Sequence, residues 1–188
     1  MRMPYRYCKG AGSIFQSLRR CYFLPDEFKE PSLEKKLREL GAPCPFIRGM
    51  CIHSGKLLTE YSTGYSEMDR VYSLPGAPMK WGERARDTLK KSFEEKYTLD
   101  ISVGRFVIVV ENKFPVFRDR PHLVELVFEI KAQSTEFVIK VPEIGLKWLD
   151  MNELDRYNFN PTELKHAIFA QNIHRLKHII AGDLKFVK

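Results

Sequence analysis

The residues best suited to chemistry in this 188-residue chain are the acidic side chains between positions 83 and 95, namely Glu83, Asp87, Glu94 and Glu95. Carboxylate oxygens are the ligands that Mg²⁺ prefers, so such a group could hold a divalent cation and activate a water molecule. Ligands on one helical face must be three or four positions apart, because those residues are neighbours on a helix. The element that carries these acids therefore decides which of them can act together.

Residues 74–99 are predicted to form a turn followed by an amphipathic helix. The Pro-Gly pair at 75–76 ends a preceding strand and lets the backbone turn. Apolar residues recur four positions apart and give the helix one buried stripe, at Ala85, Leu89 and Phe93. Glu83 lies near the helix start, where a carboxylate stabilises the helix dipole whether or not it binds a ligand.

The same stretch resembles the signature of the Nudix hydrolases. That signature is a Gly, five residues, Glu, seven residues, Arg-Glu, an apolar residue, any residue, Glu-Glu, any residue, Gly and an apolar residue. Its fixed positions fall at Ala77, Glu83, Lys91, Ser92, Phe93, Glu95, Lys96, Thr98 and Leu99. Glu83, Phe93, Glu95 and Leu99 match the pattern, and Lys91 conserves only charge. The signature is therefore degenerate at Ala77, Ser92, Lys96 and Thr98.

The resemblance implies a metal site on the helix, which this chain retains only in part. In the family, glutamates at the positions of Ser92, Glu95 and Lys96 hold Mg²⁺ against a pyrophosphate. Here Glu95 is the one remaining carboxylate, and we treat it as the candidate catalytic residue and metal ligand. Glu94 and Glu83 are further candidate ligands, and a loop acid such as Glu143 could help to rebuild a site. Lys96 is expected to repel a metal and to pair with a nearby carboxylate.

The flanking sequence predicts the strands of an α/β protein, a Nudix-like α/β/α sandwich with a mixed β-sheet. Residues 46–61 form a hairpin pattern around the Ser54-Gly55 turn. Further strands are expected at residues 105–111, 122–131, 135–141 and 143–148. Asn160 and Pro161 are expected to open a last helix, with Asn160 as its N-cap. The resemblance covers residues 46–169, which we assign to one Nudix-like domain.

The two ends of the chain are basic. We expect a basic N-terminal arm with a short helix at residues 1–45 and a basic helical extension at residues 170–188. The net charge is +7, and the first 25 residues contain five basic residues and no acid. These basic residues are candidates for nucleic-acid binding: Arg2, Arg6, Lys9, Arg19 and Arg20. A basic surface that serves only solubility is the alternative.

Composition limits the class and the compartment. The chain is 44% hydrophobic and 29% charged, which is typical of a soluble globular protein, and no apolar run reaches the roughly 18 residues of a membrane helix. The four cysteines have no Cys-x-x-Cys spacing, so we expect free thiols in a reducing compartment and a cytoplasmic protein. An organellar location is the alternative, because the Arg-rich, acid-free start resembles a transit peptide.

Two functions remain open from the sequence. The first is a non-hydrolytic module that binds a nucleotide or RNA, or that assembles with a protein or ribonucleoprotein, needs no cofactor and could form a homodimer. The second is an atypical Nudix hydrolase that cleaves a nucleoside diphosphate linked to another group and uses Mg²⁺ or Mn²⁺ in a remodelled site. Ligand selection would fall to the loops at residues 62–70 and 112–120.

Overall fold

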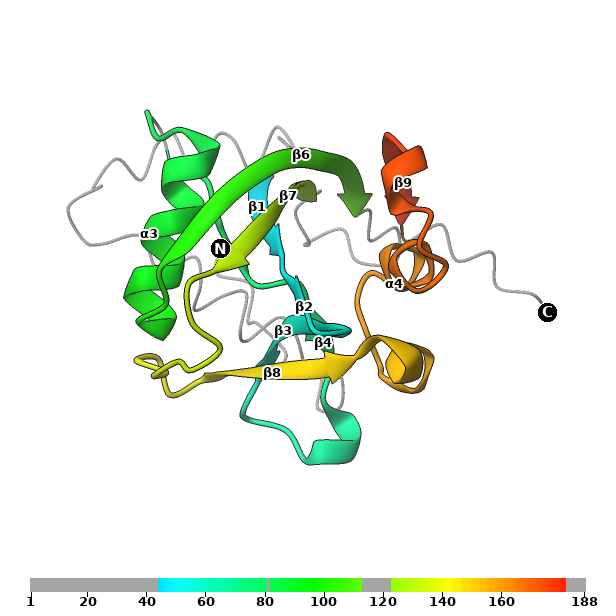
Figure 1. Ribbon diagram of the computed structural model, residues 1–188, viewed down its shortest axis with the longest axis horizontal. Helices are drawn as coiled ribbons and strands as arrows, with labels where there is room; N and C mark the ends of the chain where they lie inside the picture. The colour runs from blue at the N-terminus through cyan, green and yellow to red at the C-terminus, as the bar shows by residue number, and fades with distance from the viewer. Residues whose placement is uncertain (1–43, 81, 113–122, 182–188) are drawn as a thin grey trace, which may run out of the picture.

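The computed structural model describes residues 44–80, 82–112 and 123–181, and its strands form two sheets (Figure 1). The larger sheet has the strand order β5 (Gly76–Pro78), β1 (Cys44–Met50), β7 (Leu123–Ala132), β6 (Ile101–Asn112) and β9 (His178–Ala181). In the smaller sheet, β3 (Lys56–Ser62) pairs with β2 (Ile52–His53), β4 (Tyr72–Ser73) and β8 (Ile144–Asp150). Of the predicted arm and short helix at residues 1–45, residues 1–43 lie outside the described residues, and residues 44–45 belong to β1 instead.

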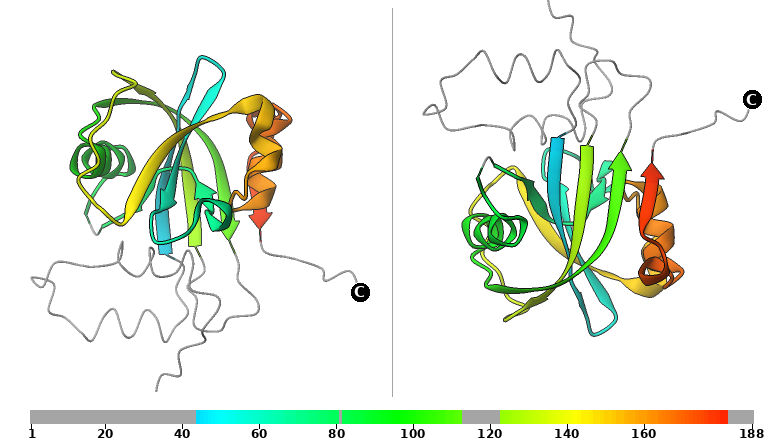
Figure 2. Two further views of the ribbon diagram at one scale, coloured as in Figure 1. Left: turned by 90° about the horizontal axis from the view of Figure 1, so that it is seen from below. Right: turned by 90° about the horizontal axis from the view of Figure 1, so that it is seen from above.

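The larger sheet is mixed, as expected. β1 runs parallel to β7 and β6 runs parallel to β9, whereas the β1–β5 and β6–β7 pairs are antiparallel. Helices α3 (Ala85–Tyr97) and α4 (Thr162–Phe169) lie on opposite sides of the strands in both views of Figure 2. The prediction of an α/β/α sandwich with a mixed sheet is therefore confirmed.

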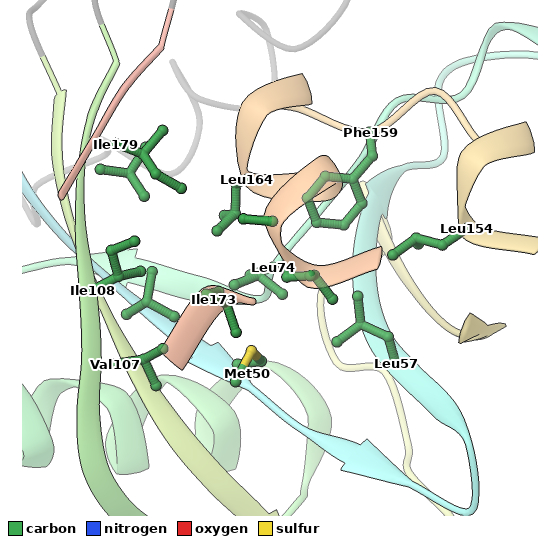
Figure 3. Packing of buried hydrophobic residues seen from close by; sticks show 14 of the residues in the cluster. Met50, Leu57, Leu74, Val107, Ile108, Leu154, Phe159, Leu164, Ile173 and Ile179 are labelled. Carbon is green, nitrogen blue, oxygen red and sulfur yellow. The ribbon is translucent and has the colours of Figure 1, made fainter. Parts of the chain in front are cut away.

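Two apolar clusters hold the helices in place. The stripe predicted for α3 packs into one of them, with Leu89, Phe93 and Tyr97 fully buried. The other cluster lies between α4, β9 and both sheets, and Figure 3 shows Leu164 and Phe159 among its packed side chains. Burying such side chains contributes roughly 1.5–3 kcal/mol each, so these two clusters fix where α3 presents its polar face.

The hairpin after β1 forms where the sequence predicts it. Ser54 and Gly55 both have positive φ, 48° and 74°, the conformation that a two-residue hairpin turn requires. The loop at residues 62–70 is largely exposed, as expected, and contains the short 3₁₀ turn η1 (Glu67–Asp69). Among the described residues, no helix is long and apolar enough to cross a membrane.

Three predictions about secondary structure are wrong. Residues 135–141 form no strand, because their amides bind the end of α3: Val138 N–H donates to Tyr97 O, and Lys140 N–H donates to Lys96 O. Helix α4 begins after Pro161, with no side-chain cap from Asn160. Beyond α4 the chain forms the 3₁₀ turn η3 (Ile173–Arg175) and strand β9, so the expected helical extension is wrong at residues 178–181.

Candidate functional site

The polar face of α3 presents a serine and a lysine to the first residue of strand β5. Ser92 and Lys96 are four positions apart and lie on one face of the helix. Lys96 Nζ donates a hydrogen bond of 2.5 Å to Gly76 O, and Ser92 Oγ lies 3.5 Å from the same oxygen. A Cβ at Gly76 would collide with Ile47 O, so only glycine lets β5 approach β1 closely enough here.

A carboxylate from the smaller sheet completes this arrangement. Glu60 Oε2 on β3 lies 3.3 Å from Lys96 Nζ and also accepts a hydrogen bond from the Tyr97 hydroxyl. The side chains of Lys96 and Glu60 are only 15% and 9% exposed, so the pair is largely shielded from water. Lys96 therefore pairs with a nearby carboxylate, as the sequence predicts. Its ammonium stands between two oxygens, those of Gly76 and Glu60.

The candidate metal ligands lie elsewhere: Glu94 and Glu95 are on α3, and Glu83 comes just before it. The side chain of Glu95 is 61% exposed, and its Oε1 is 4.0 Å from Lys91 Nζ. Glu83 accepts a 3.0 Å hydrogen bond from Thr88 Oγ1 and lies 3.6 Å from the same Lys91 Nζ. Glu94 is exposed. Within residues 44–80, 82–112 and 123–181, no three His, Cys, Asp or Glu residues form a group that could hold a metal.

The residues of the described site therefore do not fit a divalent cation. Ser92 offers a neutral hydroxyl where the resemblance implies a carboxylate, and Lys96 brings a positive charge to within hydrogen-bonding distance of both Gly76 O and Glu60. The Lys96 ammonium, held at this position, repels a divalent cation and competes with it for the same oxygen ligands. The Glu95 side chain is exposed to solvent, and its carboxylate lies near Lys91 Nζ.

The other degenerate positions of the signature, Thr98 and Ala77, have structural roles. Thr98 follows α3 in the left-handed conformation, with φ 50° and ψ 38°, and its N–H donates to the helix carbonyls. The chain therefore keeps at Thr98 the backbone conformation that glycine adopts most easily. Ala77 pairs with Ile47 between β5 and β1. The candidate nucleic-acid residues of the N-terminal arm lie outside the described residues: Arg2, Arg6, Lys9, Arg19 and Arg20.

A buried ion pair in the larger sheet was not predicted from the sequence. Arg48 on β1 and Glu125 on β7 are joined at 3.2 Å, with side-chain exposures of 8% and 2%. Arg48 also donates to Leu74 O at 2.8 Å and lies over the Phe46 ring, 4.0 Å from its centroid. The only signal in the sequence was a charged residue inside each of two apolar runs, which does not identify the partner.

No protein-family model matches the sequence, and neither does any curated protein sequence. Solved structures do match. A MutT Nudix hydrolase from Burkholderia pseudomallei is 19% identical with a TM-score of 0.55, and the match covers 69% of this chain and 97% of that one. A UDP-X diphosphatase is 19% identical with a TM-score of 0.56 over 88% of this chain and 80% of that one.

A third match is an ADP-ribose pyrophosphatase from Streptococcus suis, 17% identical with a TM-score of 0.52 over 73% of this chain and 98% of that one. The mixed sheet, the two flanking helices and these matches agree. The chain has the Nudix fold. At these identities the likeness concerns the fold, and the function has to be argued from the site.

Proposed function

We propose that this protein is a Nudix-fold module that binds a nucleotide or RNA, or assembles with a partner, without hydrolysing a diphosphate. One observation carries the proposal: the Lys96 ammonium lies between Gly76 O and Glu60, on the helix face where the resemblance implies metal ligands. An ammonium cannot polarise a phosphate or generate hydroxide as a divalent cation does. It can still form a charge-assisted hydrogen bond with a phosphate oxygen.

The distribution of charge supports a polyanionic ligand. The described residues contain seventeen basic and seventeen acidic side chains, so the net charge of +7 comes from residues 1–43, 81, 113–122 and 182–188. Basic segments attached to a neutral body suit a ligand such as RNA, because lysine and arginine neutralise its phosphates. The proposed ligand is therefore a phosphate-bearing molecule held by the domain and by its basic segments.

The test is a calorimetric titration of the full chain with Mg²⁺ and Mn²⁺, beside a titration of the Ser92→Glu/Lys96→Glu variant. We expect no metal binding by the unaltered protein and measurable binding by the variant. In parallel, the affinity for a single-stranded RNA is measured across salt concentrations and should fall as salt rises. A metal site of micromolar affinity in the unaltered protein contradicts the first expectation. RNA affinity that is absent, or indifferent to salt, removes the nucleic-acid part of the proposal.

The comparisons favour a second function, an atypical diphosphate hydrolase. Two of the matching structures are, by their names, a UDP-X diphosphatase and an ADP-ribose pyrophosphatase. For this function Glu95 and Glu83, which both approach Lys91, would have to take up a metal after Lys91 moves. The site as described has no such arrangement, and for that reason we place this function second.

Incubation with ADP-ribose, NAD, capped RNA and nucleotide sugars in Mg²⁺ or Mn²⁺ distinguishes the two functions. The hydrolase would release a nucleoside monophosphate, and Glu95→Gln would abolish that release. Glu136→Gln is the matched control, since Glu136 is an exposed glutamate that is not a candidate metal ligand. Absence of turnover over the whole panel supports the non-hydrolytic module.

A further inference from the structure

A second polar cluster lies on the smaller sheet, away from the site at α3. It consists of two cations, Arg70 and Lys147, above three tyrosines, Tyr61, Tyr72 and Tyr157, and we call it the Arg70–Lys147 cluster. The Arg70 guanidinium lies 4.6 Å from the centroid of the Tyr61 ring, and Lys147 Nζ lies 5.9 Å from that of Tyr157. Tyr72 lies between the other two rings, with centroid distances of 5.5 Å to each.

The cluster is on the opposite face of β3 from Glu60. Neighbouring residues of a strand point to opposite faces, so Tyr61 and Glu60 serve different sites. Tyr61 is opposite Gly145 on β8, and a Cβ at Gly145 would collide with the tyrosine ring. The ring is therefore held against the sheet by close packing, with the Arg70 guanidinium on it.

One exposed carboxylate joins both cations. Glu67 Oε1 is 3.5 Å from Arg70 NH1 and 3.4 Å from Lys147 Nζ. The Glu67 side chain is 71% exposed and belongs to η1, a turn with no buried residue, seen as the short blue-green coil below β8 in Figure 1. Exposed ion pairs of this kind contribute little to stability, so another carboxylate could replace Glu67 at little cost.

The two cations are better fixed than the carboxylate between them. The Arg70 side chain is 24% exposed, and its Nε is buried without a hydrogen-bond partner among the described residues. Burial acts to lower the pKa of Lys147, but Tyr72, Glu67 and Tyr157 outweigh it and the pKa is raised, so Lys147 is charged at neutral pH. The Arg70 NH1 atom and the Lys147 ammonium both contact the exposed Glu67 carboxylate, and two cations held side by side in this way are suited to an incoming carboxylate.

We propose that the Arg70–Lys147 cluster is a docking site for an acidic segment of a partner protein, whose Asp or Glu carboxylate replaces that of Glu67. The site already binds a carboxylate of its own chain in this geometry. A single-stranded nucleic acid fits less well, because bases stack on open ring faces. Here Arg70 covers Tyr61, Tyr72 is 3% exposed, and the rings are inclined at 60° and 78° to one another. This proposal is independent of the function proposed for the α3 site.

The test measures binding of a fluorescent hexaglutamate peptide to the full chain by anisotropy. Arg70→Gln/Lys147→Gln should weaken binding by about fivefold or more, the factor that corresponds to roughly 1 kcal/mol. Glu67→Gln should tighten binding by a factor of about two to five, because it removes the carboxylate that competes with the peptide. The basic segments outside the cluster are present in every variant and contribute equally.

Glu129→Gln is the matched control, because it also removes one carboxylate and releases Arg105 from a 2.8 Å ion pair on the other sheet. Circular dichroism checks that each variant is folded. The proposal is overturned if the double variant binds the peptide as tightly as the unaltered protein, or if Glu129→Gln tightens binding as much as Glu67→Gln does. It is also overturned if no variant binds the peptide, or if an oligouridylate depends on Arg70 and Lys147 more strongly than the peptide does.

Discussion

Glu60 on β3 and Lys96 on α3 form a largely buried ion pair, with Oε2 3.3 Å from Nζ, and thereby join the helix to the smaller sheet. The two residues are 36 positions apart in the chain, and the Tyr97 hydroxyl donates to the same carboxylate. A buried carboxylate requires such partners, because an ion away from water is costly unless it is paired. The lysine that departs from the Nudix signature has therefore become part of the packing of the domain.

Replacing Lys96 with methionine should destabilise the protein by about 3 kcal/mol, because removing one member of a buried pair leaves the other charge uncompensated. Urea unfolding followed by circular dichroism measures this change. Lys91→Met is the matched control on the same helix, since the Lys91 side chain is 53% exposed and its pairs are 3.6 Å or longer. The double variant Lys96→Met/Glu60→Gln should recover most of the loss. Equal effects of Lys96→Met and Lys91→Met would contradict a structural role for the pair.

Local signals in the sequence accounted for the elements around this ion pair. The Ser54-Gly55 turn specifies the hairpin whose second strand contains Glu60, and the stripe of Leu89 and Phe93 specifies the face of α3 that is buried. The sequence also predicted that Lys96 would pair with a carboxylate. It did not identify Glu60, because the closeness of β3 and α3 depends on how two sheets and a helix pack together.

The errors have a similar cause. Residues 135–141 were predicted to form a strand, but the helix end at residues 96–97 offers carbonyl oxygens, and the amides of Val138 and Lys140 bind them. Arg48 and Glu125 are 77 positions apart and meet only because β1 and β7 are neighbours. Such pairings are set by strand order, which local periodicity does not encode.

Glu125→Gln should be destabilising by about 3 kcal/mol, since it leaves the Arg48 guanidinium buried without its anionic partner. The side chains of Arg48 and Glu125 are 8% and 2% exposed, so water cannot replace the lost charge. Thermal and urea unfolding measure the effect. Glu129→Gln on the same strand is the control, because its pair with Arg105 is exposed and should change stability little. A Glu125→Gln variant as stable as the control would contradict this reasoning.

The Cys51 thiol should react slowly in the folded protein. Cys51 is 2% exposed, and burial raises the pKa of its thiol, although a backbone hydrogen bond with Ala132 acts to lower it. Because the thiolate is the nucleophile, a raised pKa moves the onset of reaction to higher pH than for an ordinary cysteine. The variant Cys8→Ser/Cys21→Ser/Cys44→Ser leaves Cys51 as the one cysteine that can react. Its reaction with a chromogenic disulfide at pH 8 should be more than about tenfold slower than in urea. Equal rates in the two conditions would show that Cys51 is accessible.

Thr98→Gly should stabilise the protein, which is unusual for a substitution that removes a side chain. Thr98 has φ 50°, a conformation that costs a β-branched residue roughly 1 kcal/mol and costs glycine almost nothing. Two effects reduce this gain in stability. The substitution removes the exposed 3.3 Å hydrogen bond from Thr98 Oγ1 to Val138 O, and glycine has greater conformational freedom in the unfolded chain. The expected net gain is about 0.5 kcal/mol, measured by urea unfolding. Thr98→Ala is the control, because it removes the hydroxyl but keeps the Cβ that is strained at positive φ. If Thr98→Gly is no more stable than Thr98→Ala, the left-handed backbone at the end of α3 does not limit the stability of this domain.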